Sequence, residues 1–298
     1  MRKRQNYSRN LFIFFSLAPA MILYILFKII PTLQVFRMAL FKTSALSKNP
    51  KFVGLNNFKI LFNDTRFIKT FQNTILLIVI VTIVTLTIAV IFAAILVTEK
   101  IKGAGLFRVI FYIPNILSIV VVSGIFSAIY DPGRGLIDSI LIMFRIKPPQ
   151  FGWLGDQNIV IYSIAFALIW QAIGYYMVMY MAAMSAIPNS IYEAADIDGA
   201  GKITKFFKIT LPLVWLNIRT TLAFFIISTI NLSFLLVVPL TGGGPDGATE
   251  VFLSYMYSQA YTNQSYGYGM TIGVIVFLFS FALSGIINVV TNREILQY

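Results

Sequence analysis

Long uncharged apolar runs separated by short charged segments dominate this chain. Windows without Asp, Glu, Lys or Arg cover residues 70–98, 109–130, 157–192, 220–245 and 251–292. A bilayer core about 30 Å thick needs about 20 apolar residues per helix, and a charge at mid-bilayer costs about 2.5–3.5 kcal/mol. Together with an apolar N-terminal run, the windows predict six membrane spans, near 11–41, 70–98, 108–130, 157–184, 213–240 and 267–291.

These spans predict an all-α fold, a polytopic transmembrane helical bundle that forms one domain over residues 1–298. Lys28 interrupts the first span, and we expect its long side chain to reach the headgroup region. An even number of spans places both termini on one side of the membrane. Counting charges divides the 23 Lys and Arg residues almost evenly between the two sides. The four cations before the first span and the absence of cations from 240–268 favour cytoplasmic termini.

Composition supports lipid as the solvent of this chain. Hydrophobic residues make up 58% and charged residues 11%, against about 25% charged in soluble domains. Cysteine and histidine are absent, which removes disulfides, thiolate chemistry and the commonest metal ligand. We therefore expect no catalytic residue and no metal site. The net charge of +12 indicates anionic lipid headgroups rather than nucleic acid as the counterpart.

The segment 188–212, between the fourth and fifth predicted spans, carries the most specific pattern. Pro188 can open a short helix, and Gly199 and Gly201 can turn the chain sharply. An amphipathic piece with three regularly spaced lysines follows, and Pro212 is expected to end it and begin the fifth span. The pattern predicts a helix–turn–helix on the cytoplasmic face.

Read by type and spacing, this segment is Glu193-Ala194-Ala195, three residues, Gly199, nine residues, Ile209, one residue and Leu211-Pro212. It resembles the EAA loop of binding-protein-dependent ABC importer permeases. The resemblance implies the type I ABC importer permease fold. It also implies that 188–212 is a coupling loop, which sits in a groove of the ATP-binding subunit and turns ATP-driven closure into helix movement. The coupling residues would be Glu193, Ala194, Ala195, Asp198, Gly199, Ile209, Leu211 and Pro212.

A glycine-lysine pair in the same loop only superficially resembles a phosphate-binding loop. The Walker pattern needs glycine five residues before that glycine, and Ser or Thr directly after the lysine. Asp196 and Ile203 occupy those positions. We therefore expect this chain to be no enzyme and to hold no cofactor, with ATP and Mg²⁺ bound by a partner ATPase subunit.

Three further stretches resemble the carbohydrate branch of these permeases, which is related to the maltose importer. They are 52–58, 103–114 and 241–245, followed by Thr249 and Tyr266-Gly267. The resemblance implies four kinds of partner in a bacterial cell membrane: a second homologous permease, two ATP-binding subunits, an extracellular solute-binding protein and a sugar. The binding protein would dock on Gly242, Gly243, Gly244 and Pro245.

Polar residues inside the fourth and fifth spans are the candidate sugar contacts. Sugars bind hydrogen-bonding groups and flat aromatic faces, and intramembrane polar groups face the bundle interior or a cavity. Hydrogen bonding between helices is the alternative use of the same groups. The candidates are Gln171, Tyr175, Ser228, Thr229, Asn231 and Ser233.

The uncharged spans argue for a neutral solute. They count against a permease for glycerol-phosphate or polyamines in the same fold, although a partner subunit could supply charge. An ion-coupled secondary transporter, a second alternative, would need carboxylates or broken helices at mid-membrane, and the sequence gives no sign of either.

Overall fold

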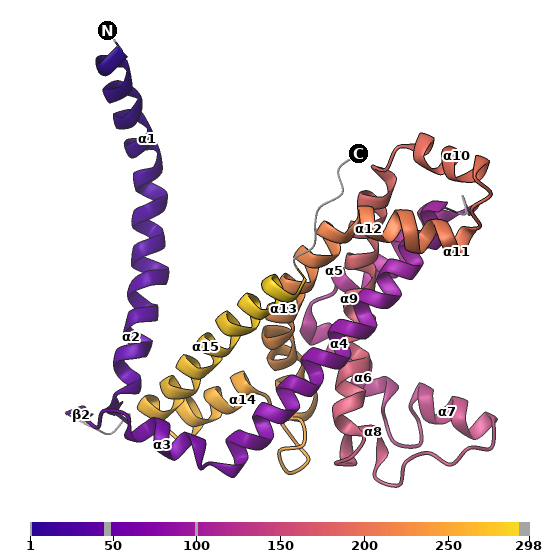
Figure 1. The fold of residues 1–298 in the computed structure, drawn as a ribbon. Coiled ribbons are helices and arrows are strands. Elements are labelled where there is room, and N and C mark those ends of the chain that lie inside the picture. The colour runs from indigo at the N-terminus through magenta and orange to yellow at the C-terminus, as the bar shows by residue number, and fades with distance from the viewer. Residues whose placement is uncertain (1, 45–48, 99–100, 292–298) are drawn as a thin grey trace. The chain divides into compact units, whose positions relative to one another are not determined.

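A computed structural model describes residues 2–44, 49–98 and 101–291, and these residues are helical almost throughout (Figure 1). This confirms the predicted all-α class. Contacts within the chain divide it into two compact units, Met1–Asp64 with Met256–Phe277, and Thr65–Tyr255 with Leu278–Tyr298.

The first unit begins with one long helical stretch, and its side chains from Leu11 onward are largely exposed. No residue of its most apolar window is buried within the structure. This is expected of a helix that is surrounded by lipid or packs against another protein. A two-stranded antiparallel pair, in which Phe41 lies opposite Phe52, follows the helices. The elements before Asp64 are α1 (Arg2–Tyr24), η1 (Ile25–Ile29), α2 (Ile30–Ala39), β1 (Phe41–Lys42), β2 (Lys51–Phe52) and α3 (Asn56–Phe62); η3 (Ser258–Thr262) and the first half of α15 (Tyr266–Val290) complete the unit.

Two residues from the stretches that resemble sugar permeases hold the first unit together. The Asn57 side-chain amide donates to the carbonyls of Ala39 at 2.8 Å and Phe41 at 3.1 Å. Gly267 lies so close to the same turn that a Cβ there would be 2.0 Å from the Phe41 carbonyl oxygen. Asn57 therefore ties α3 to the end of α2 and to β1, and Gly267 allows the start of α15 to approach the same turn.

Three long helices form the core of the second unit, α4 (Thr65–Thr98), α9 (Val160–Ser185) and α13 (Trp215–Thr241). They lie side by side (Figure 1), and alanines such as Ala93 and Ala167 are fully buried among them. Small residues allow helix backbones to approach closely in a membrane protein. The shorter elements of this unit are α5 (Ala104–Ile116), α6 (Ile119–Ile129), α7 (Leu136–Met143), α8 (Gly152–Gly155), α10 (Asn189–Ile197), α11 (Lys202–Lys205), η2 (Phe206–Thr210), α12 (Leu211–Leu213) and α14 (Phe252–Tyr257), the last of which continues into the first unit.

Five of the described helices are long and apolar enough to cross a membrane, namely Leu11–Ala39, Thr65–Val97, Val160–Ser185, Trp215–Thr241 and Tyr266–Val290. A sixth span arises if α5 and α6 count together, and these two helices are bent by 101°. The break begins at Ser118, whose backbone is extended and whose hydroxyl accepts the Val121 amide. Such a cap starts a new helix in a new direction. The expectation that no membrane helix is broken was therefore wrong.

Candidate functional site

The predicted coupling loop folds as two short helical limbs joined by a turn. The first limb, α10, ends with two bonds from beyond the helix: Gly199 N donates to the Asp196 carbonyl, and Ala200 N to the Ala195 carbonyl. This pattern places the residue after the cap in the left-handed region, where glycine is favoured, and φ of Gly199 is 74°. Gly201 is different, because its φ of −69° and ψ of 165° suit any residue. Only the first glycine is therefore required for the turn.

Two side-chain bonds join the limbs of the coupling loop. The Tyr192 hydroxyl lies 2.9 Å from Thr210 Oγ1, and Lys205 Nζ lies 2.6 Å from Asp196 Oδ1. The second limb does not end at Pro212 as predicted, because Pro212 lies inside α12 directly after the π-helical turn η2. Proline removes one backbone donor, and π-helix occurs mostly as single turns inside helical stretches. The loop is thus one braced hairpin.

The hairpin exposes half of the residues assigned to coupling. Glu193, Ala194, Asp198 and Gly199 are exposed, whereas Ala195 packs inward. Glu193 also lines a groove of about 770 Å³ between the two limbs and the adjacent ends of α4 and α9. On the second limb, Ile209, Leu211 and Pro212 are half-buried.

Sequence reasoning missed one residue of the hairpin. The side chain of Ile197 is 88% exposed, although it is apolar and lies at the tip of α10. An apolar residue between two aspartates directly before a glycine turn was the available signal. Ile197 is therefore a candidate anchor for a docking partner.

A cavity of about 620 Å³ lies between α5, α9 and α13. Its volume falls within the range of small-molecule sites, roughly 300–1,000 Å³. Aromatic rings and neutral hydrogen-bonding groups share its surface, and no charged side chain lines it among the residues that the structure describes. The lining residues are Asn115, Ala172, Tyr175, Tyr176, Met179, Thr220, Thr221, Phe224, Phe225, Ser228, Asn231 and Leu232.

Half of the predicted sugar contacts line this cavity, namely Tyr175, Ser228 and Asn231. The structure does not bring Thr229 and Ser233 to it. Both are buried and donate to carbonyls of their own helix, at 2.8 Å and 2.9 Å, so their hydroxyls are satisfied without a ligand.

The remaining predicted contact, Gln171, is buried outside the cavity lining. Asn115 was missed in its place, because the third span was taken as an ordinary apolar helix. A proline followed by a polar residue, Pro114-Asn115, close to Ser118 was the signal for a broken span.

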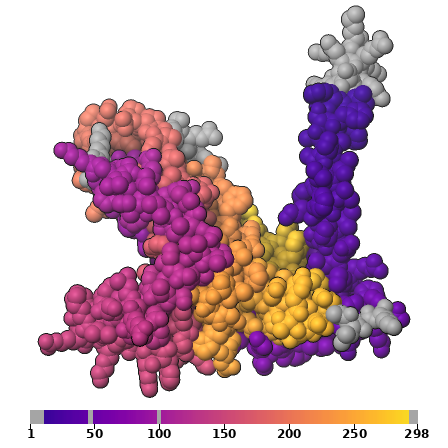
Figure 2. Space-filling model, turned by 180° about the vertical axis from the view of Figure 1, so that it is seen from behind, coloured from indigo at the N-terminus to yellow at the C-terminus, as the bar shows by residue number. Residues whose placement is uncertain are grey.

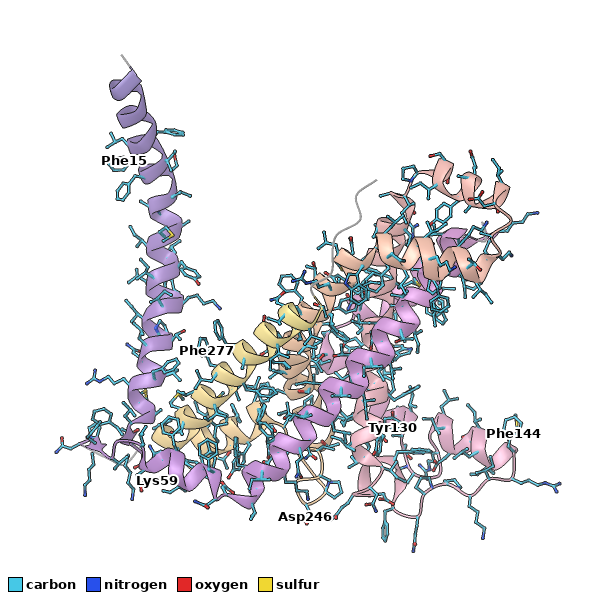
Figure 3. The ribbon with its side chains drawn as sticks, in the orientation of Figure 1. Phe15, Lys59, Tyr130, Phe144, Asp246 and Phe277 are labelled. Atoms are coloured by element: carbon cyan, nitrogen blue, oxygen red, sulfur yellow. The ribbon has the colours of Figure 1, made fainter. Side chains whose placement is uncertain are left out.

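The glycine-rich outer loop closes on itself through threonines. Gly242 and Gly243 have φ values of 60° and 91°, which glycine adopts at little cost. Thr249 Oγ1 donates to the Gly244 carbonyl at 2.8 Å and lies 2.7 Å from Thr241 Oγ1. The predicted docking residues therefore occupy one compact turn, with Asp246 at its tip (Figure 3).

An ion pair that sequence reasoning missed fixes this loop to the start of α4. Glu250 is 4% exposed, and its carboxylate accepts two bonds from Arg66, from Nε at 2.7 Å and from a terminal guanidinium nitrogen at 2.9 Å. Asn73 donates to the Gly247 and Glu250 carbonyls, and Lys69 donates to the Asp246 carbonyl. The signal was a lone glutamate between two long uncharged windows. In the described residues, no group of three or more acidic residues lies close enough to hold a metal ion.

Comparisons with known proteins show the family to which this chain is related. Residues 86–295 match the family described as binding-protein-dependent transport system inner membrane component. The chain is similar to the diacetylchitobiose uptake system permease protein NgcF of Streptomyces coelicolor, with 28% identity over 92% of this chain and 80% of that protein. It is also similar to the sn-glycerol-3-phosphate transport system permease protein UgpA of Escherichia coli O157:H7, with 32% identity over 82% of each chain.

A solved structure shares the fold. A chain of the bacterial alginate ABC transporter in complex with an alginate pentasaccharide-bound periplasmic protein superposes with a TM-score of 0.85. The identity is 19%, and the match covers 98% of each chain. The predicted ABC importer permease fold is therefore confirmed.

Proposed function

This chain belongs to the family of binding-protein-dependent transport system inner membrane components, and from that membership we propose that it is the permease of an ATP-driven sugar importer. It is a multi-pass membrane protein. It would reside in the bacterial cell membrane, with both termini in the cytoplasm. It would form half of the translocation path beside a second homologous permease. Two ATP-binding subunits and an extracellular binding protein would complete the transporter.

The uncharged cavity between α5, α9 and α13 is the observation that supports a sugar as the substrate. Aromatic faces from Tyr175 and Phe224 and amide groups from Asn115 and Asn231 line it together. These are the groups that hold a sugar through stacking and hydrogen bonds, and a phosphate ester would call for cations instead. NgcF, named for diacetylchitobiose uptake, supports the sugar, whereas UgpA, named for glycerol-phosphate transport, keeps that solute as the second candidate.

The coupling hairpin supports the proposal that a separate subunit binds ATP and that this chain transmits the resulting movement. Its two limbs are braced by side-chain bonds, so a force applied at its tip reaches α9 and α13, which flank it in the chain. ATP and Mg²⁺ would be bound by the partner ATPase, and this chain would convert closure of that subunit into helix movement. The path would then open outward to a docked, loaded binding protein.

Reconstitution of the complete transporter in liposomes tests the proposal. ATP hydrolysis and solute uptake are measured with binding protein loaded with a candidate sugar, with glycerol-phosphate, or empty. Sugar-loaded binding protein should stimulate both activities. Stimulation by glycerol-phosphate alone would transfer the assignment to the second candidate, and uptake without ATP hydrolysis would exclude an ABC importer.

Replacing Glu193 with Lys should uncouple the transporter. The substitution reverses the charge at an exposed position of the hairpin, and loss of one charge-assisted contact of about 1.5–3 kcal/mol corresponds to roughly ten- to hundredfold weaker coupling. Stimulated ATP hydrolysis and uptake measure the loss, and correct assembly is checked by co-purification. Asp131→Lys makes the same charge change at an exposed position directly after α6, outside the hairpin, and should leave coupling intact. Full coupling in Glu193→Lys would remove this residue from the coupling surface.

Replacing Asn231 with Leu should impair uptake without uncoupling the ATPase. The side chain lines the cavity, and one unpaired hydrogen-bonding group in a site costs about 1–3 kcal/mol, or roughly five- to hundredfold in uptake efficiency. Thr229→Val provides the matched control on α13, because its hydroxyl bonds within the helix. Equal losses in both variants would favour helix packing over solute contact.

A further inference from the structure

The connection from α6 to α9 presents an apolar surface that nothing in the described chain covers. Figure 2 shows this segment standing out from the body of the second unit, and Figure 3 shows Phe144 at the far end of α7. Met143 is 73% exposed and Phe144 65% exposed. The large exposed apolar side chains here, named below the outer apolar surface, are Leu136, Ile140, Ile142, Met143, Phe144, Ile146 and Phe151.

The segment is braced from within, so its shape does not depend on a partner. Asp138, on the opposite side of α7, is 2% exposed, and its carboxylate accepts the Gly133 amide at 2.8 Å and Trp153 Nε1 at 2.7 Å. The Tyr130 ring lies 6.3 Å from the Trp153 ring, and its hydroxyl donates to the Ser163 carbonyl. The only acidic side chain of α7 is therefore directed inward, and Leu136, Ile140 and Met143, which share the other face of the helix, are exposed.

Cations border the outer apolar surface. Arg145 and Lys147 follow α7 directly and are exposed, and Arg134 precedes it. Arg145 has φ of 60°, which places it in the turn that closes the helix, next to Phe144. The exposed end of α7 therefore combines large apolar side chains with positive charge.

The position of the segment in the chain restricts what can cover this surface. It connects α6, which is long enough to cross a membrane only together with α5, to α9, which is long and apolar enough by itself. Figure 1 shows α7 extending sideways from α6, across the direction of α9. A helix at the end of two spans, apolar on one side and bordered by cations, has the character of an interfacial helix.

We propose that α7 and the turn after it lie in the membrane interface at the end of α6 and α9. The outer apolar surface inserts among the acyl chains, and Arg145 and Lys147 bind the phosphates of anionic lipid headgroups. Contiguous apolar surface of this kind is rare on a water-exposed face, and cations near an anionic leaflet are attracted to it. This interaction is independent of the transported solute.

Because the sequence contains no cysteine, a single introduced cysteine can be labelled selectively in this chain. A single Phe144→Cys substitution in the complete transporter is labelled with an environment-sensitive fluorophore and reconstituted in phosphatidylcholine vesicles. Gln157→Cys, an exposed polar position just before α9, is the matched control. The emission at position 144 should shift to shorter wavelength and be quenched by lipids brominated in the acyl chain, while the control stays accessible to aqueous iodide.

Adding phosphatidylglycerol to the vesicles tests the headgroup contact. The blue shift at position 144 should increase, and the increase should be lost when Arg145→Asn and Lys147→Gln are combined; asparagine tolerates the left-handed backbone at position 145. Iodide quenching at position 144 would overturn the proposal. So would protection that brominated lipid does not affect, which indicates the partner permease, or protection that appears only with the binding protein. An unchanged signal with phosphatidylglycerol would overturn the headgroup contact.

Discussion

Replacing Gly174 with Ala should strongly impair transport, because α5 and α9 touch at this residue. An added Cβ would lie 1.8 Å from the Phe111 carbonyl oxygen and 2.8 Å from the Tyr112 Cα. The two backbones would have to separate by more than about 1 Å to reach even a tight contact of 3.0 Å. Overpacking of this kind costs roughly 1–3 kcal/mol, and backbone atoms cannot rotate away. The separation would also displace Asn115, which lies on α5 and lines the cavity.

Thermal inactivation of the purified transporter and solute uptake measure this effect. A loss of about 2 kcal/mol corresponds to a midpoint lowered by roughly 5 °C. Gly124→Ala is the control, because Gly124 also lies within a helix and a Cβ there would have nothing within 4 Å. Normal uptake and stability in Gly174→Ala would mean that α5 and α9 do not pack closely in the functioning transporter.

The long spans could be predicted from the sequence because the bilayer imposes one strong rule on it. A charge at mid-membrane is costly, so uncharged windows outline helices regardless of how those helices pack. The same rule does not predict the break at Ser118, because a helix can bend without a charged residue. Local chemistry controls the break, namely a serine cap that begins α6, and a window of apolar residues conceals it.

The candidate site was predictable where local geometry defines it. Gly199 must adopt a left-handed conformation to end α10, so its place in the pattern follows from backbone sterics alone. The cavity is different, because its lining comes from three helices that are distant in the sequence. Helical spacing puts Gln171 and Tyr175 on one face, yet the partner helices decide that Tyr175 lines the cavity and Gln171 does not.

Long-range contacts occupy two of the cations that the charge count treats as markers of orientation. Arg66 and Lys69 lie between the first and second predicted spans, so the charge count assigns both to the outer side. Arg66 binds Glu250, and Lys69 binds the Asp246 carbonyl. A cation that binds a distant loop stabilises that loop and carries no information about membrane orientation. No local sequence pattern reveals such a contact between residues 184 positions apart.

Replacing Arg66 with Met should weaken the response to the binding protein, because the ion pair fixes the loop proposed to dock it. The substitution leaves the Glu250 carboxylate, whose side chain is 6% exposed, without its bidentate partner. Removing one member of a buried pair costs roughly 3–5 kcal/mol. The Arg66 side chain is 56% exposed, and solvent screening therefore reduces the expected cost to about 1–3 kcal/mol. Affinity for the binding protein, measured by fluorescence anisotropy, should fall roughly five- to hundredfold, while basal ATP hydrolysis persists.

A double-mutant cycle separates positioning of the loop from a direct contact. Combining Arg66→Met with Glu250→Gln removes the unpaired buried charge, so the double variant should bind better than Arg66→Met alone, with a coupling energy of about 0.5–3 kcal/mol. Arg66→Lys should be intermediate, since lysine keeps the charge and cannot form the bidentate pair. If Arg66 instead contacted the binding protein itself, the second substitution would restore nothing and the losses would add. Loop position would then not depend on this pair, and the threonine bonds within the turn and the bonds from Lys69 and Asn73 would hold the docking surface.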